Sequence, residues 1–152
     1  MELLSAQALA GALREARGAS DWPAAVCLAV EGLLGHVARE PVFARVGFVE
    51  IFATGPAGVR RRTALMGGFA EVLVRRAPSR TRPSPLVAEA IAGAVWGIVH
   101  HEVVHGRARG LRALGPHTAY LALAPVLGGE RAMLEIERAA GRARRGRTFE
   151  QS

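Results

Sequence analysis

Prolines divide this chain into segments, and five of them stand at or near the start of an apolar stretch with helical spacing. Proline is tolerated in the first turn of an α-helix, where its missing N–H has no intrahelical partner, but it disrupts a helix interior. Because Val, Ile and Thr nowhere cluster in alternating runs between turn signals, the pattern predicts helices and no sheet. The prolines that mark helix starts are Pro23, Pro41, Pro56, Pro85 and Pro116.

Helical spacing of the apolar residues predicts six helices in one all-α domain. The expected helices cover residues 3–17, 22–40, 41–54, 56–76, 85–105 and 116–127. The third is apolar around most of its circumference, so we expect it to be buried on several sides. The fourth begins with Arg60, Arg61 and Arg62, which we expect near an exposed start. A polar, proline-punctuated loop at 77–83 separates the fourth helix from the fifth.

The fifth expected helix is apolar on two opposite faces. At about 100° per residue, one face carries Val87, Ile91, Val95 and Ile98, and the other carries Trp96, His100 and Val103. Between them lies a strip of small residues, which lets another helix backbone approach closely. Since both faces must be covered, we expect a second copy of the chain to cover one of them. The strip consists of Ala90, Gly93, Ala94 and Gly97.

Composition limits the cellular setting. The single cysteine, Cys27, cannot form an internal disulfide, and the N-terminus lacks the pattern of a secretory signal, so we expect a cytoplasmic protein. The longest weakly charged stretch, 90–99, is shorter than the ~20 apolar residues that a membrane helix needs. All 20 basic residues are arginine and the net charge is +7. That charge alone does not indicate a nucleic-acid partner.

The stretch from Phe48 to Arg62, FVEIFATGPAGVRRR, joins an apolar helix to a basic helix start through a Gly-Pro break. Together with residues 85–105 and 116–127, it resembles the ligand-binding and dimerisation half of the TetR family of transcriptional regulators. The resemblance covers about residues 21–127. It implies an all-α bundle of about six or seven helices, in which helices 85–105 and 116–127 form a four-helix bundle with a second copy.

A repressor of this family senses a small-molecule effector with this half and contacts DNA with a helix-turn-helix headpiece. Because pocket-type helical sequence starts almost at Met1, we expect DNA contacts only through a headpiece outside this chain. The resemblance implies a homodimer whose interface uses Ala90, Gly93, Ala94, Gly97, His101, Tyr120 and Leu123. We assign residues 1–129 to the ligand-binding and dimerisation domain and residues 130–152 to a basic tail, partly helical or disordered.

An apolar pocket between the second to fifth helices is the expected effector site. A few polar groups would orient a small apolar or aromatic ligand among the aromatic side chains. Aromatic residues at helical spacing also fill ordinary cores, so a structural helical dimer without a ligand is the alternative. The expected ligand-binding residues are Phe48, Phe52, Met66, Phe69, Trp96, His100, Glu50 and Glu89.

The segment His101 to His105 matches the H-E-x-x-H pattern of zinc proteases, with Glu102 in the position of the general base. Metzincins have Gly and His at fixed offsets after this pattern, but Ala108 and Leu111 stand there. A zinc-dependent hydrolase is therefore the remote alternative, and we expect no enzymatic activity, no metal and no cofactor. The arginines of the tail, at 138, 142, 144, 145 and 147, have no interleaved aromatics, so we expect at most weak, nonspecific DNA binding.

Overall fold

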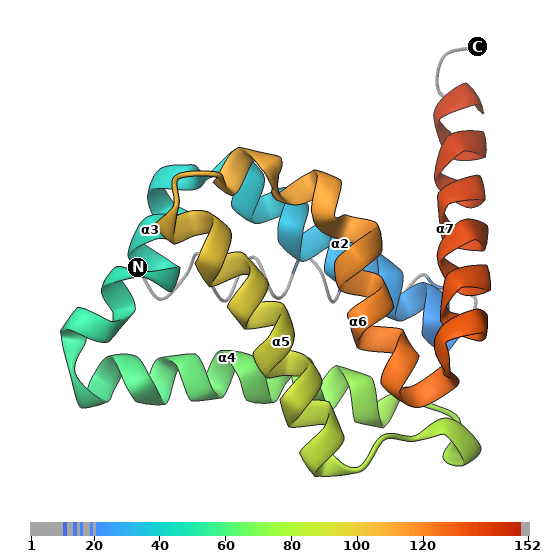
Figure 1. Ribbon diagram of the computed structural model, residues 1–152, viewed down its shortest axis with the longest axis horizontal. Helices are drawn as coiled ribbons and strands as arrows, with labels where there is room; N and C mark the ends of the chain where they lie inside the picture. Colours follow the sequence, from blue (N-terminus) through green and yellow to red (C-terminus); the bar gives the residue numbers. More distant parts are fainter. Residues whose placement is uncertain (1–10, 12–13, 15, 17–18, 20, 150–152) are drawn as a thin grey trace.

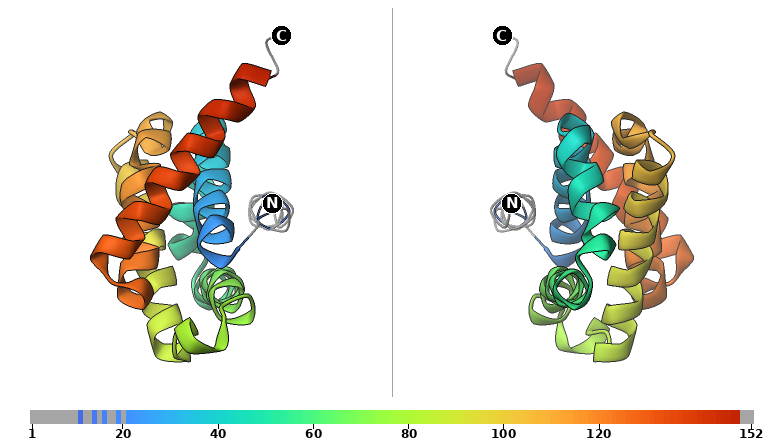
Figure 2. Two further views of the ribbon diagram at one scale, coloured as in Figure 1. Left: turned by 90° about the vertical axis from the view of Figure 1, so that its right-hand side faces the viewer. Right: turned by 90° about the vertical axis from the view of Figure 1, so that its left-hand side faces the viewer.

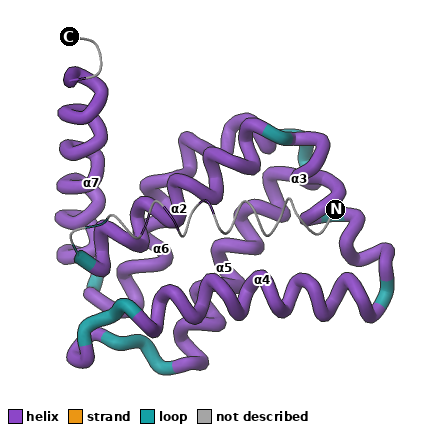
Figure 3. Tube along the Cα trace, turned by 180° about the vertical axis from the view of Figure 1, so that it is seen from behind, coloured by secondary structure: helices purple, strands orange, loops and turns teal. Residues whose placement is uncertain are grey.

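The computed structural model describes residues 11, 14, 16, 19 and 21–149, and the side chains of these except Phe43, Phe52 and residues 147–149. The helix expected at 3–17 lies almost entirely outside the described residues. Every regular element within them is helical, so the predicted all-α fold is confirmed (Figure 3). The α-helices are α2 (Trp22–Arg39), α3 (Pro41–Phe48), α4 (Pro56–Arg75), α5 (Pro85–Val104), α6 (Gly115–Leu127) and α7 (Gly129–Phe149). Three short 3₁₀ helices join them: η1 (Glu50–Thr54), η2 (Ser79–Thr81) and η3 (Ala108–Leu114).

Local sequence signals set the helix starts as predicted. The Asp21 carboxylate accepts a hydrogen bond from the Ala24 N–H at 2.9 Å, and the Ser84 hydroxyl accepts one from the Val87 N–H at 3.3 Å. Each cap precedes a proline in the first helical turn. Gly55, just before α4, has φ of 63°, a conformation that glycine adopts without steric cost. The Gly-Pro break between an apolar helix and a basic helix start is therefore confirmed.

The prediction of one continuous helix over 41–54 is wrong. The α-helix ends at Phe48, and the chain winds more tightly through η1 before the turn at Gly55. The segment is buried only in part, although α3 contacts α2, α5 and η3. Ala44 is buried, whereas the Val42 side chain is 74% exposed.

The helices pack in layers (Figures 1 and 2). Helices α5 and α6 lie side by side at the front of Figure 1, and α2 lies behind α6. Helix α4 crosses α5 and connects through η1 to α3. The outward faces of α5 and α6 are not covered by another described element.

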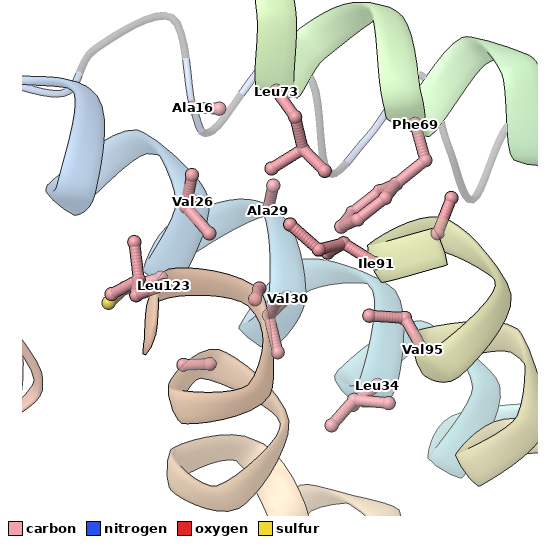
Figure 4. Close-up of a cluster of buried hydrophobic side chains, with 14 of the residues drawn as sticks. Ala16, Val26, Ala29, Val30, Leu34, Phe69, Leu73, Ile91, Val95 and Leu123 are labelled. Carbon is pink, nitrogen blue, oxygen red and sulfur yellow. The ribbon is translucent and has the colours of Figure 1, made fainter. Parts of the chain in front are cut away.

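The core lies where α2, α4, α5 and α6 meet (Figure 4). Side chains from all four helices interdigitate there, and the largest fully buried ones include Leu34, Leu73 and Leu123. The Trp22 indole N–H donates a buried hydrogen bond to the Leu73 carbonyl at 3.1 Å, which ties the start of α2 to α4. Leu111 of η3 is also fully buried, although no helical turn was predicted between α5 and α6.

Helix α7 extends beyond the last helix that the sequence indicated. The segment expected to be a basic tail, partly helical or disordered, is helical to Phe149. Its first turns pack against α6 and α2, and its far end stands clear of the bundle (Figures 1 and 2). Near its middle, the buried Glu135 accepts a hydrogen bond from Arg138 at 3.0 Å.

Helix α5 is, within the described residues, the one helix long and apolar enough to cross a membrane by length and composition alone. The weakly charged stretch in the sequence covers only residues 90–99, whereas the helix has 20 residues. Seven of them are buried against other helices: Ala88, Ile91, Ala92, Val95, Trp96, Val99 and Val103. Core packing therefore accounts for one side of its apolar surface, and the other side is open.

Candidate functional site

Two aromatic side chains from different helices meet at the junction of α3 and α5. The Phe48 and Trp96 ring centroids lie 4.5 Å apart with the ring planes tilted by 36°. This geometry lies within the range that favours aromatic pairs. Trp96 is buried and Phe48 is half-buried, so the pair lies at the edge of the core. The structure thus brings together two of the residues predicted to line a pocket.

Helix α4 completes this cluster with Met66 and Arg62, which are one helical turn apart. The Met66 methyl lies close to Gly93 of α5, 3.5 Å from where a Cβ would stand. The Arg62 guanidinium carbon lies 5.7 Å from the centre of the Trp96 ring, a cation–π arrangement. We call Arg62, Met66, Phe48 and Trp96 the aromatic corner.

Arg62 was not among the predicted site residues, because all three arginines were expected near an exposed helix start. A usable signal was present: Arg62 precedes Met66 by four residues and Phe69 by seven, so it shares their inward face. Its Nε is shielded from solvent and has no hydrogen-bond acceptor among the described residues. A buried, unpaired donor of a charged group is unfavourable, so this atom needs an explanation.

The other predicted pocket residues lie elsewhere. Phe69 is buried in the core beside Leu73 and Ile91 (Figure 4), and the side chain of Phe52 is outside the described part. His100 is half-buried, one turn after Trp96. Glu50 and Glu89 are exposed, contrary to their expected place beside apolar faces; Glu50 Oε1 lies 3.9 Å from Arg45 Nε. Neither carboxylate therefore needs a buried partner.

Helix α5 presents an uncovered side, which we call the outer face. It comprises the exposed residues Leu86, Ala90, Ala94, Gly97, His101 and Val104. Leu86 is 76% exposed and Val104 is 43% exposed. Four of the residues predicted for a dimer interface therefore lie on one accessible helix side.

Three other predicted interface residues are placed differently. Leu123 is fully buried in the core of the single chain, so it has no surface to offer a partner and is removed from the interface. Gly93 faces Met66 of α4 within the same chain. Tyr120 is half-buried, with its hydroxyl 2.8 Å from where a Cβ on Gly129 would stand. The resemblance had placed Leu123 in the interface, and the strip of small residues had placed Gly93 there.

The H-E-x-x-H segment lies at the exposed end of α5. The His101 and His105 rings have centroids 4.3 Å apart, and His105 Nδ1 lies 2.7 Å from the His101 carbonyl oxygen. In the part of the chain that the structure describes, no group of three or more His, Cys, Asp or Glu residues could hold a metal ion. The zinc-hydrolase alternative thus has no third ligand there.

Glu102, the residue in the general-base position, is held by Arg107. The Arg107 Nε and Nη2 groups donate hydrogen bonds of 2.9 and 2.7 Å to the two carboxylate oxygens of Glu102. These bonds lower the pKa of Glu102 below its ordinary value, and the charges of Arg107, His101 and His105 act in the same direction. Such a carboxylate is a weaker base than an unpaired one.

The Glu102–Arg107 pair should be visible in a pH titration. Because the folded-state pKa is lowered, the pair contributes stability above the unfolded-state pKa and loses it as pH falls through the folded-state pKa. We expect the Glu102 carboxyl carbon to titrate in NMR spectra below 4.5, the ordinary value. Arg107→Gln should raise the midpoint towards that value. An unchanged midpoint in this variant would mean that Arg107 does not set the pKa.

Cys27 is buried in α2 and is a free thiol. Burial, followed by the nearby charge of Glu31, raises the pKa of Cys27 to about 11. At neutral pH the thiol is therefore protonated, which argues against a role as a nucleophile.

The sequence matches no protein-family model, no curated protein and no solved structure.

Proposed function

We propose that this chain is a homodimeric, ligand-sensing domain of a TetR-type transcriptional regulator, with a small apolar or aromatic effector. The outer face of α5 is the observation that carries the proposal. A helix that is apolar on both sides is usually covered on both, and small side chains favour a second helix as the cover. A second copy of α5 and α6 has the matching surface, since symmetric interfaces use the same patch on both subunits.

The aromatic corner supports the ligand-sensing part of the proposal. It lies where α3, α4 and α5 meet, and α5 also carries the outer face. A ligand bound against Trp96 would therefore contact the helix that forms the dimer. Such a ligand shifts the protein between helix arrangements only by its difference in affinity for them. The alternative, a structural dimer without ligand, retains the outer face but requires no binding at the corner.

Two exposed helical glycines provide a matched test of the interface. A Cβ added to Gly97 on the outer face or to Gly67 on α4 would have no atom of the chain within 4 Å. In a dimer, Gly97→Leu should overpack the helix contact at a cost of about 1 to 3 kcal/mol. This corresponds to an increase in the dimer dissociation constant of about 5- to 150-fold. Gly67→Leu should leave the dimer intact.

Sedimentation equilibrium at micromolar concentration measures both variants beside the wild type. Circular dichroism shows whether each variant retains its helices, so that a loss of folding is not mistaken for dissociation. A monomeric wild type would contradict the proposal, as would equal dissociation of the two leucine variants.

A further inference from the structure

We infer that Arg62 binds the carboxylate of an apolar monoanionic ligand at the aromatic corner. The inference rests on the proposed function and specifies its ligand class. An apolar effector without an acid group would leave the Arg62 Nε without a hydrogen-bond acceptor. Its starting point is the solvent-shielded Nε of Arg62, which has no acceptor.

The geometry of Arg62 leaves its donors available. Its guanidinium lies over the Trp96 ring, which holds the cation without using its N–H groups. The structure gives Arg62 no hydrogen bond or ion pair with another described residue. A guanidinium presents its N–H groups as a planar fork, which matches a carboxylate in two parallel hydrogen bonds. A ligand carboxylate would supply the acceptor that Nε lacks.

The surrounding charges favour an anion. Arg60 and Arg61 precede Arg62, and the first turn of α4 contains no acidic residue. The nearest acid in sequence, Glu71, forms an ion pair with Arg75. The next, Glu50, is exposed, and its Oε1 lies 3.9 Å from Arg45 Nε. The start of α4 is therefore electropositive both from its side chains and from the helix dipole, and it attracts negative charge.

The rest of the corner favours an apolar body on that anion. Phe48, Met66 and Trp96 present aromatic rings and a thioether, with no carboxylate among them. A ligand that is all polar would gain little here, and one that is all apolar would leave the guanidinium unpaired. The combination selects amphipathic acids, such as a medium-chain fatty acid or an aryl-acetic acid.

Calorimetric titration with matched probes tests this choice. The acids are decanoate and 1-naphthaleneacetate, and the controls are decanol and 2-(1-naphthyl)ethanol, which keep the apolar body. Acetate tests for simple ion binding. We expect the wild type to bind at least one acid about tenfold or more tightly than its alcohol, and to bind acetate negligibly. Whichever of the two acids binds more tightly shows whether the apolar part of the ligand is aliphatic or aromatic.

Arg62→Met and Arg60→Met form the matched pair of variants. Both remove one positive charge from the same part of α4, but Arg60 is exposed, whereas the Arg62 guanidinium lies over the Trp96 ring. Arg62→Met should lower acid affinity about tenfold or more and leave alcohol affinity unchanged, while Arg60→Met should change both by less than about threefold. Because an unpaired donor is removed, the melting temperature of Arg62→Met should not fall. If Arg62→Met does not fold, Arg62→Gln should show the same loss of preference for acids.

The possible failures are distinct. If acids and alcohols bind equally and Arg62→Met has no effect, the sensor proposal stands and the acid inference fails. If no probe binds, the acid inference fails, and so does the sensor proposal for these ligand classes. If Arg62→Met lowers the melting temperature without changing ligand preference, Arg62 has a packing role only and the inference is overturned.

Discussion

Replacing Gly58 with alanine is expected to destabilise the protein by about 3 kcal/mol. Gly58 lies in the first turn of α4, directly against η1. A Cβ at this position would fall on the Ile51 carbonyl oxygen and against the Thr54 hydroxyl. The Ile51 carbonyl already accepts a hydrogen bond from that hydroxyl at 2.7 Å, so neither atom can move without breaking the turn. Chemical denaturation measures the change in the free energy of unfolding.

Gly67→Ala on the same helix is the matched control. No atom lies within 4 Å of a Cβ built on Gly67, so alanine meets no obstacle. Because alanine has a higher helix propensity than glycine, this variant should be more stable by about 0.5 to 1 kcal/mol. Equal effects of the two substitutions would show that η1 does not press against α4 at Gly58.

Replacing Leu123 with alanine is expected to cost about 2 to 5 kcal/mol, because it empties a fully buried position in the core. The loss should be the same at low and high protein concentration if Leu123 belongs to the core of one chain. Were Leu123 an interface residue instead, the loss would depend on concentration through dimer dissociation. Thermal unfolding at several concentrations separates the two cases.

Leu121→Ala is the control on the same helix. The Leu121 side chain is 45% exposed, so its truncation should cost less than about 1 kcal/mol of intrinsic stability. A larger effect of Leu121→Ala than of Leu123→Ala would contradict the orientation of α6.

Helix starts could be predicted from the sequence because the signals are local. Asp21 and Ser84 need only the next three residues to make their caps, and the following prolines need no partner at all. Gly55 likewise signals its turn by its own conformational freedom. The all-α fold follows from such signals repeated along the chain.

The site could be predicted only in part, because it depends on which neighbour covers which face. Spacing placed Phe48, Met66 and Trp96 on apolar faces, and the structure brings them together. Spacing could not distinguish a side that packs within the chain from one left open, so it assigned Gly93 to the interface although Gly93 lies against Met66. Arg62 was overlooked because an arginine over a tryptophan ring depends on a contact between distant segments.

Helix α7 is long and packs against the bundle along only part of its length. It contacts α6 and α2 near its start, and a helix of its 21 residues is about 30 Å long. The first half of α7 is held in place, since Ala132 is fully buried and Ile136 and Ala139 pack against the core. A bend beyond Ala139 would move the last turns, which carry Arg144 and Arg145, and leave the core unchanged.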